Sequence, residues 1–164
     1  MPELPEVETV RRGIERRAIG RVIERVEVFR ERTVRRQGRE AIIDGLTGAR
    51  LVAARRRGKY LLCDLDTGGV LMMHLRMSGR VLVVPTHTPR PPHTHVVMHL
   101  SPDQTGGRHE MWFVDPRTFG EVVVFDRNDE HRAAPELARL GPDPIVTGST
   151  SRALHKFCTV DAAT

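Results

Sequence analysis

The stretch RLVAARRRGKYLLCDLDTGGVLMMHLRM, residues 50–77, decides the fold. It contains three runs rich in Val, Leu, Met and Ala, which are interrupted by Gly58 and by the DTGG sequence at 66–69. Short apolar runs separated by glycine-containing turns are typical of β-strands joined by hairpins. This stretch therefore predicts three consecutive antiparallel strands.

The same pattern continues on both sides of this stretch. The run RVIERVEVF (21–29) precedes it, and four runs follow it: RVLVV, HVVMHL, EMWFVD and GEVVVF. The proline-rich segment PTHTPRPPHTH predicts a loop between two of these runs. Closely spaced strands connected by turns favour a mainly β (α+β) fold, an antiparallel β-sandwich or flattened barrel with helices packed on it.

Helical spacing of apolar residues occurs mainly at the N-terminus. Over residues 5–19, Val7, Val10, Ile14 and Ala18 recur at three- and four-residue intervals, and Gly20 follows as a stop signal. REAIIDGL predicts a short helix over 39–46, and PELARLGPDP predicts another that ends at a proline. We therefore expect an N-terminal helix and one or two short helices.

Length and composition exclude several classes of protein. The chain has 164 residues, of which 39% are hydrophobic, enough for one domain with a core. No apolar run approaches the ~20 residues of a membrane helix, and no targeting signal is visible, so we expect a cytoplasmic protein without a membrane partner. Cys63 and Cys158 form no CxxC pair, so we expect no metal site and no disulfide framework.

The charge is unevenly distributed along the chain. Residues 1–60 hold 16 Lys or Arg against 9 Asp or Glu, whereas residues 61–164 hold 10 against 12. A basic excess of this kind favours a polyanionic partner, nucleic acid first. The alternative is a solvated surface from an arginine-rich proteome, which the ratio of 24 arginines to 2 lysines also fits.

The N-terminal sequence MPELPEVETV is a candidate reactive site. If Met1 is removed, Pro2 provides a secondary amine whose pKa lies well below that of lysine, so more of it is nucleophilic at neutral pH. Its attack on an aldehyde carbon gives an iminium ion, and Glu3 and Glu6 would supply proton transfer. Taken alone, the stretch fits a capped leader helix better than a reactive site.

Three further stretches carry candidate binding residues. In RRRGKYLL, Lys59 follows a tight glycine turn and begins a strand, which suits a phosphate contact or a plain surface lysine. In HLRMSG, Met77 fits a core position or a turn. In DPRTFG, Arg117 and Phe119 lie near a turn, where such a pair can fill a gap in stacked bases or simply complete the turn.

The four stretches PELPEVETVRRG, RRGKYLL, HLRMSG and DPRTFG occur in this order, and together they closely resemble the formamidopyrimidine-DNA glycosylase family. The resemblance extends from residue 2 to about 145, where LGPDPI also fits. HLRMSG and DPRTFG favour the formamidopyrimidine branch over the endonuclease VIII branch. The resemblance implies a bacterial base-excision repair enzyme: a DNA glycosylase and abasic-site lyase for oxidised purines such as 8-oxoguanine and formamidopyrimidines.

The resemblance also assigns roles to four candidate catalytic residues. Pro2 would attack the sugar C1′ and form the Schiff base. Glu3 would be the general acid on the opened sugar, and Glu6 would lie in the same site. Lys59 would be the active-site lysine near the lesion and its phosphates.

Four other residues would bind the DNA. Met77, Arg117 and Phe119 would occupy the space that a flipped-out base leaves, and His93 in PHTHV would contact a phosphate. The implied partner is double-stranded DNA with an oxidised base or an abasic site. We expect a monomer associated with the nucleoid.

The family continues beyond LGPDPI with a helix–two-turn–helix domain and a four-cysteine zinc finger. We therefore assign 1–145 to the N-terminal catalytic domain and 146–164 to a truncated start of the next domain or a tail, with no cofactor in this chain. Two alternatives remain. One is a non-catalytic remnant that binds damaged DNA, and the other is a tautomerase that uses Pro2 as a base, against which Glu3 and the strand-rich body argue.

Overall fold

The computed structural model describes residues 4–76 and 78–140, which form eight strands and several short helices. The strands are β1 (Ile23–Val28), β2 (Leu51–Arg57), β3 (Tyr60–Leu65), β4 (Gly69–His74), β5 (Arg80–Pro85), β6 (Thr94–Leu100), β7 (His109–Val114) and β8 (Glu121–Asp126). The helices are α1 (Leu4–Arg17), α2 (Arg39–Leu46), α3 (Glu130–Ala133) and α4 (Pro135–Ala138), with 3-10 turns η1 (Glu31–Val34) and η2 (Arg127–Asp129).

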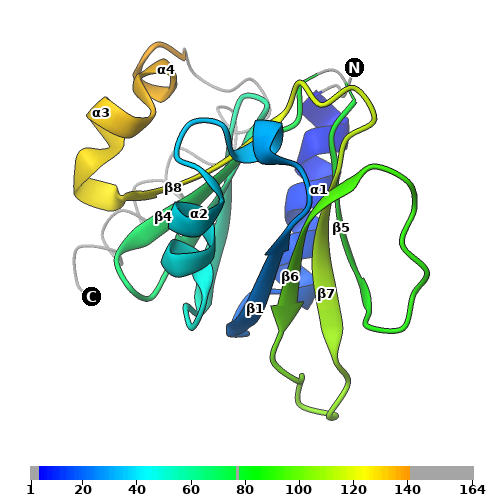
Figure 1. Ribbon diagram of the computed structural model, residues 1–164. Coiled ribbons are helices and arrows are strands. Elements are labelled where there is room, and N and C mark those ends of the chain that lie inside the picture. The colour runs from blue at the N-terminus through cyan, green and yellow to red at the C-terminus, as the bar shows by residue number, and fades with distance from the viewer. Residues whose placement is uncertain (1–3, 77, 141–164) are drawn as a thin grey trace.

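The strands form two antiparallel sheets of four, in the orders β1-β6-β7-β5 and β2-β3-β4-β8. The consecutive strands β2, β3 and β4 are joined by short turns, as the stretch at 50–77 predicts. Figure 1 shows the two sheets side by side, with β4 and β8 in one and β6 and β7 in the other. The predicted antiparallel sandwich is therefore confirmed.

Helices close both open sides of the sandwich. Helix α1 packs against β2 and β5, which are edge strands of different sheets, and α2 packs against the opposite edge strands β1 and β8. Edge strands expose unpaired backbone groups that invite association, so a helix over each pair protects them. The buried face of α1 carries Val7, Ile14 and Ala18, at the spacing that the sequence predicts.

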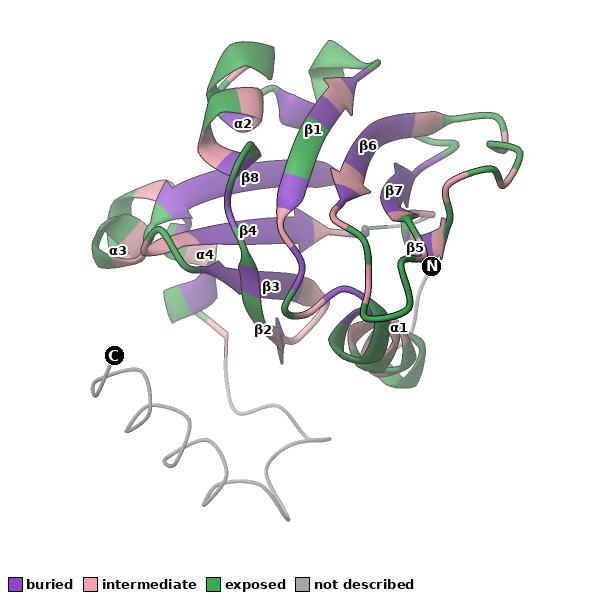
Figure 2. Ribbon diagram, turned by 90° about the horizontal axis from the view of Figure 1, so that it is seen from below, coloured by how far each residue is buried: buried purple, intermediate pink, exposed green. Residues whose placement is uncertain are grey.

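The main core lies between the sheets and includes Leu61, Met73, Met98 and Phe113. A second cluster, which includes Leu62, Met72 and Leu137, lies between the outer face of β3-β4-β8 and the helices α3 and α4. Figure 2 shows this face, with buried strand residues next to α3 and α4. Because both faces of β3 and β4 are covered, their sequences are nearly continuous apolar runs.

Two expectations need correction. The N-terminal helix ends at Arg17, two residues before the predicted end, and α3, η1 and η2 exceed the expected one or two short helices. The additional elements are single turns of three or four residues, too short to carry a helical period. Among the described helices, none is long and apolar enough to cross a membrane.

Candidate functional site

Helix α1 begins at Leu4, so the predicted catalytic stretch leads directly into it. Pro2 and Glu3 lie outside the described residues. Glu6 lies in the first turn of α1, and its side chain is exposed to solvent. A carboxylate in the first turn interacts favourably with the positive end of the helix dipole.

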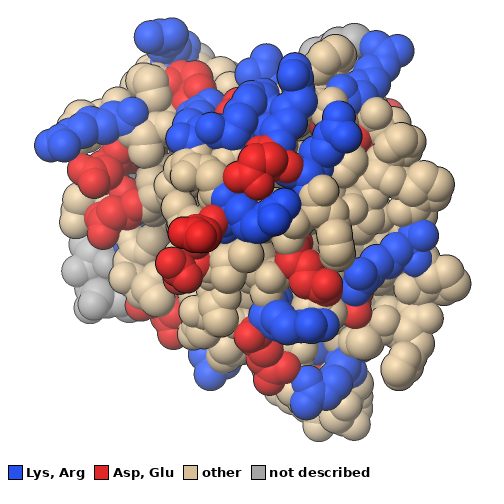
Figure 3. Space-filling view, viewed as in Figure 1, with Lys and Arg blue, Asp and Glu red and all other residues tan. Residues whose placement is uncertain are grey.

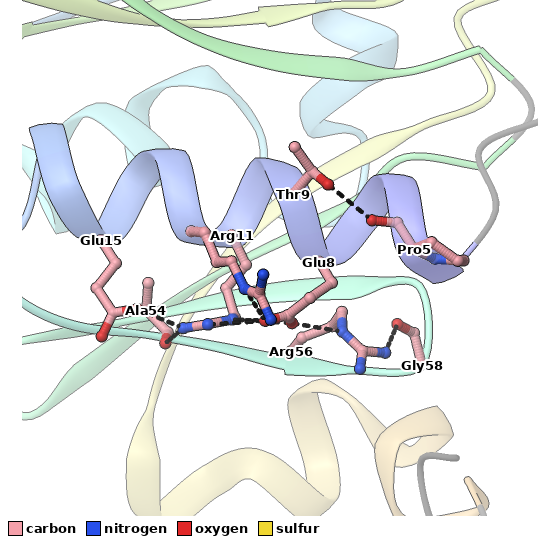
Figure 4. A network of polar contacts seen from close by, with 9 residues as sticks. Pro5, Glu8, Thr9, Arg11, Glu15, Ala54, Arg56 and Gly58 are labelled. Atoms are coloured by element: carbon pink, nitrogen blue, oxygen red, sulfur yellow. Dashed lines mark hydrogen bonds and ion pairs between the residues drawn. The ribbon is translucent and has the colours of Figure 1, made fainter. Parts of the chain in front are cut away.

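A charged network anchors the next turn of α1 to β2 (Figure 4). The carboxylate of Glu8 accepts hydrogen bonds from Arg11 (2.8 Å) on the same helix and from Arg56 (3.0 Å) on β2. Burial raises the pKa of Glu8, but the hydrogen bonds and charges of Arg11 and Arg56 outweigh it and lower the pKa to about 2. Glu8 is therefore ionised over the whole physiological range.

Arg56 connects this network to the turn that carries Lys59. Its side chain is fully buried, and its guanidinium also donates to the carbonyl of Gly58 (3.1 Å). Gly58 has φ +59°, and Gly58 and Lys59 form the two-residue turn between β2 and β3. The sequence predicts that Lys59 begins a strand. In the structure, Lys59 is the second residue of the turn, and strand β3 begins one position later, at Tyr60. The side chain of Lys59 is partly exposed.

His74 lies beside the same turn, and sequence reasoning missed it. Tyr60 and His74 are cross-strand partners on β3 and β4, and their rings stack with centroids 4.0 Å apart. Burial, followed by the positive charge of Arg76, lowers the pKa of His74 to about 4. The imidazole is therefore neutral at physiological pH. The only signal in the sequence is its position at the end of a predicted strand, within HLRMSG.

The loop between β7 and β8 is held by the buried carboxylate of Asp115. One oxygen accepts a hydrogen bond from the Ser78 hydroxyl (2.6 Å), and the other accepts one from the backbone N–H of Gly120 (2.7 Å). A Cβ on Gly120 would lie 2.7 Å from the carbonyl oxygen of His74, so only glycine fits. Asp115 thus joins this loop to the turn after β4.

Arg117 and Phe119 project from this loop. Arg117 is exposed, and Phe119 is 43% exposed, so both side chains are accessible from solvent. Two arginines of the η1 region hold the loop from the other side. Arg32 donates to the carbonyl of Thr118 (3.1 Å), and Arg35 donates to that of Phe119 (3.3 Å).

His93 lies next to this loop. Its backbone carbonyl accepts from the N–H of Asp115 (3.0 Å), and its exposed ring meets that of His95 edge-on at 6.2 Å. His95 in turn contacts the Asp115 carbonyl through Nε2 (2.7 Å). His93 has φ +68°, which is uncommon for a residue with a side chain.

The structure links the Lys59 turn, the loop that carries Arg117 and Phe119, and His93 through one series of contacts, in which Glu6 takes no part. It runs from Glu8 through Arg56 to the Lys59 turn, then through His74 to Gly120 and Asp115, and so to His93. Met77 lies outside the described residues, so the predicted distance from Pro2 to Met77 and Arg117 remains a prediction. Sequence reasoning also missed Glu8, Arg56, Arg32 and Arg35, because their partners are distant in sequence.

The described residues offer no metal centre, since no group of three or more His, Cys, Asp and Glu lies close enough together. Cys63 is buried in the core on β3, and burial raises the pKa of its thiol to about 12. A thiol that resists ionisation is a poor zinc ligand. Cys158 lies outside the described residues.

Comparisons with known proteins identify the family of this chain. A sequence model of the formamidopyrimidine-DNA glycosylase N-terminal domain matches residues 1–122. A formamidopyrimidine-DNA glycosylase of Nocardioides sp. is 45% identical over 147 residues, which cover 88% of this chain and 48% of the relative. One of Paracoccus denitrificans is 43% identical over 164 residues, which cover 94% and 54% respectively.

Solved structures give the same result. The Lactococcus lactis Fpg in complex with DNA containing an abasic site matches with a TM-score of 0.75 and 32% identity, covering 87% of this chain and 51% of that one. A MutM complex with DNA containing carbocyclic 8-oxo-G matches with a TM-score of 0.70 and 35% identity, covering 78% and 45%. The chain spans about half the length of these relatives, and it belongs to the formamidopyrimidine-DNA glycosylase family.

Proposed function

We propose that this chain acts in base-excision repair as the catalytic part of a DNA glycosylase and abasic-site lyase for oxidised purines. One observation supports the proposal most: Arg56 links Glu8 of α1 to Gly58 of the Lys59 turn, and Gly120 of the Arg117–Phe119 loop lies close to the carbonyl of His74, which suits a site formed by these three segments. The names of the relatives and the DNA in the solved complexes support the same function.

The reaction begins with the amine of Pro2 after removal of Met1. Its nitrogen attacks C1′ of the damaged nucleotide, the bond from C1′ to the base breaks, and the base leaves with a proton. The ring-opened sugar then forms an iminium ion with Pro2. Loss of a proton from C2′ eliminates the 3′ phosphate, with Glu3 as general acid on the opened sugar and Glu6 in the same site. This chemistry requires no cofactor.

The remaining residues position the DNA. Lys59, on its short turn, contacts the phosphates near the lesion, and His93 contacts a further phosphate. Arg117 and Phe119, together with Met77, fill the space that the flipped nucleotide leaves. The exposure of Arg117 and Phe119 and the hydrogen bonds that brace their loop suit this role.

We assign residues 1–145 to the catalytic domain and 146–164 to the start of a second domain or a tail. For the 164 residues alone, we expect the lyase step on a preformed abasic site to exceed excision of 8-oxoguanine. Excision requires the damaged base to be unstacked, which costs a few kcal/mol, whereas an abasic site has no base to unstack. The chain would act as a monomer on chromosomal DNA.

Borohydride trapping on abasic-site duplex DNA at low salt tests the proposal. We expect a covalent adduct with the untagged chain, strong loss with Pro2→Gly, and none when residues are added before Pro2. An adduct that survives a blocked terminus would show that Pro2 is wrongly assigned. Binding without any adduct would favour the non-catalytic remnant, and isomerisation of a keto acid substrate with no DNA binding would favour the tautomerase.

A further inference from the structure

Phe29 is the most exposed large hydrophobic side chain of the described residues, at 52%. It directly follows β1, at the edge of the sandwich where η1 and the β7–β8 loop also lie (Figure 1). Removing a phenyl ring from water lowers the free energy. A ring that is half exposed to solvent can therefore stabilise a ligand that covers it. The contacts around Phe29 indicate which ligand it suits.

One face of the Phe29 ring is already covered by Arg90. The guanidinium carbon of Arg90 lies 5.8 Å from the ring centroid, within cation–π range. Arg90 is itself held between the carboxylates of Glu27 and Glu110, at 3.4 Å from each. Glu110 is buried and also accepts from the indole N–H of Trp112 (2.8 Å). Two carboxylates therefore hold the arginine against one face of the ring and balance its charge.

Phe29 belongs to the same edge as the predicted DNA-binding loop. Its backbone N–H donates to the carbonyl of His95 (2.7 Å), and the imidazole of His95 contacts the carbonyl of Asp115 (2.7 Å). With neighbouring strands 4.7–4.9 Å apart, two strand spacings separate the backbone of Phe29 from Asp115 by about 10 Å. Three residues after Phe29, Arg32 binds the loop directly through Thr118.

Three arginines follow Phe29 closely in the chain, of which Arg35 pairs with Glu121 at 3.6 Å. Arg30, Arg32 and Arg35 are all exposed, and Arg30 pairs with no carboxylate among residues 4–76 and 78–140. Glu31, the acidic residue between them, pairs instead with Arg39 (3.5 Å). In the view of Figure 1, Figure 3 shows Lys and Arg side chains gathered along the upper edge of the molecule. An aromatic ring with arginines beside it matches a nucleic acid strand, which offers flat bases and phosphates at short intervals.

We infer that Phe29, backed by Arg90, is a stacking site for an unstacked base of the bound DNA strand, with Arg30 facing the neighbouring phosphates. This inference rests on the proposed function, because it extends the same DNA-binding edge. It adds a contact that reads no sequence, since every base has a π face. Its effect falls on strand affinity and leaves the covalent chemistry at Pro2 unchanged.

The test compares two probes with the full chain, by fluorescence anisotropy at low salt. One probe is a short single-stranded oligothymidylate, and the other is a strand of the same length made of abasic sugar-phosphates. We expect Phe29→Leu to weaken binding of the oligothymidylate roughly fivefold or more, the loss of one base–aromatic stack, and to leave the abasic strand unaffected. Phe29→Trp should preserve binding. Val52→Ala, at a side chain that is 50% exposed on β2, is the matched control.

Equal affinity of Phe29→Leu and wild type for the oligothymidylate would overturn the inference, as would equal weakening for both strands. Borohydride trapping at saturating abasic-site duplex separates this result from the proposed function. Phe29→Leu should trap as well as wild type there. If wild type forms no adduct but Phe29→Leu still weakens oligothymidylate binding, only the catalytic proposal is wrong. If wild type forms the adduct but Phe29→Leu binds oligothymidylate as well as wild type, only the stacking site is wrong.

Discussion

The start of α1 and the β7–β8 loop are both placed at the proposed DNA-binding edge, but different kinds of interaction hold them. Around α1, the carboxylate of Glu8 is surrounded by guanidinium groups, of which Arg56 is fully buried. In the loop, the carboxylate of Asp115 accepts from two neutral donors among the described residues, the hydroxyl of Ser78 and the N–H of Gly120. The first region therefore depends on charge pairing, whereas the second depends on hydrogen-bond geometry, and the two should respond differently to substitution and pH.

The largest effect should come from Arg56→Met. This substitution leaves the mostly buried carboxylate of Glu8 with one strong partner fewer, and breaking a buried pair costs about 3–5 kcal/mol. Arg12 contacts the same carboxylate at 3.1 Å, but its side chain is 67% exposed. Arg12→Met should therefore cost less than about 1 kcal/mol. Urea unfolding at neutral pH compares the two variants, and equal losses would show that burial does not set the strength of this network.

Asp115→Ala should have the next largest effect, about 2–3 kcal/mol, because it leaves two donors in a buried site without an acceptor. Asp115→Asn should recover most of this loss, since the Ser78 hydroxyl can turn and accept from the amide. The same unfolding experiment measures both. If Asn is as damaging as Ala, the negative charge of Asp115 matters and the contrast with Glu8 fails.

The strands and the helix α1 could be predicted from the sequence because each follows a local period. The runs that become β2, β3 and β4 alternate or stay apolar between glycine turns, and Val7, Ile14 and Ala18 mark one helix face. The short turns η1 and α3 could not be predicted, because three or four residues carry no period.

The candidate site was only partly visible in the sequence. Lys59, Arg117 and Phe119 stand in recognisable turns, and the structure places them as exposed or partly exposed residues of those turns. The residues that position them were missed, because Glu8 and Arg56 are separated by 48 positions and Arg32 and Thr118 by 86. Nothing in local spacing indicates that such residues meet, and only the sheet topology brings them together.

The titration of His74 should change the free energy of unfolding by about 1–2 kcal/mol with pH, once solvent screening is allowed for. Its pKa is lowered from 6.5 to about 4, so between these values the unfolded chain binds a proton that the folded chain does not. This part of the free energy of unfolding is therefore fully present above pH 6.5 and is lost as the pH falls to 4. Glu8, with its pKa lowered from 4.5 to about 2, acts in a separate, more acidic range.

His74→Phe should flatten the unfolding free energy between pH 6.5 and 4, and it should leave the decline at more acidic pH unchanged. Phenylalanine keeps the ring stack on Tyr60, and the Nδ1 atom that it removes has no hydrogen-bond partner among the described residues. Urea unfolding at a series of pH values measures the effect. An unchanged slope above pH 4 would show that His74 does not titrate as its burial requires.

The smallest effect on stability should come from Arg32→Ala. Arg32 is exposed, and its bond to the Thr118 carbonyl is a single hydrogen bond at the surface, so its removal should cost less than about 1 kcal/mol.

The effect of Arg32→Ala on DNA binding should be larger than its effect on folding, because that bond fixes the loop that carries Arg117 and Phe119. Abasic-site DNA affinity should fall severalfold, and the salt dependence should fall by about one released counterion if Arg32 also meets a phosphate. Arg12→Ala, which removes an arginine of α1 that is also exposed, provides the reference. If both variants weaken DNA binding equally at every salt concentration, then Arg32 contributes only its charge, and its hydrogen bond to the loop is dispensable.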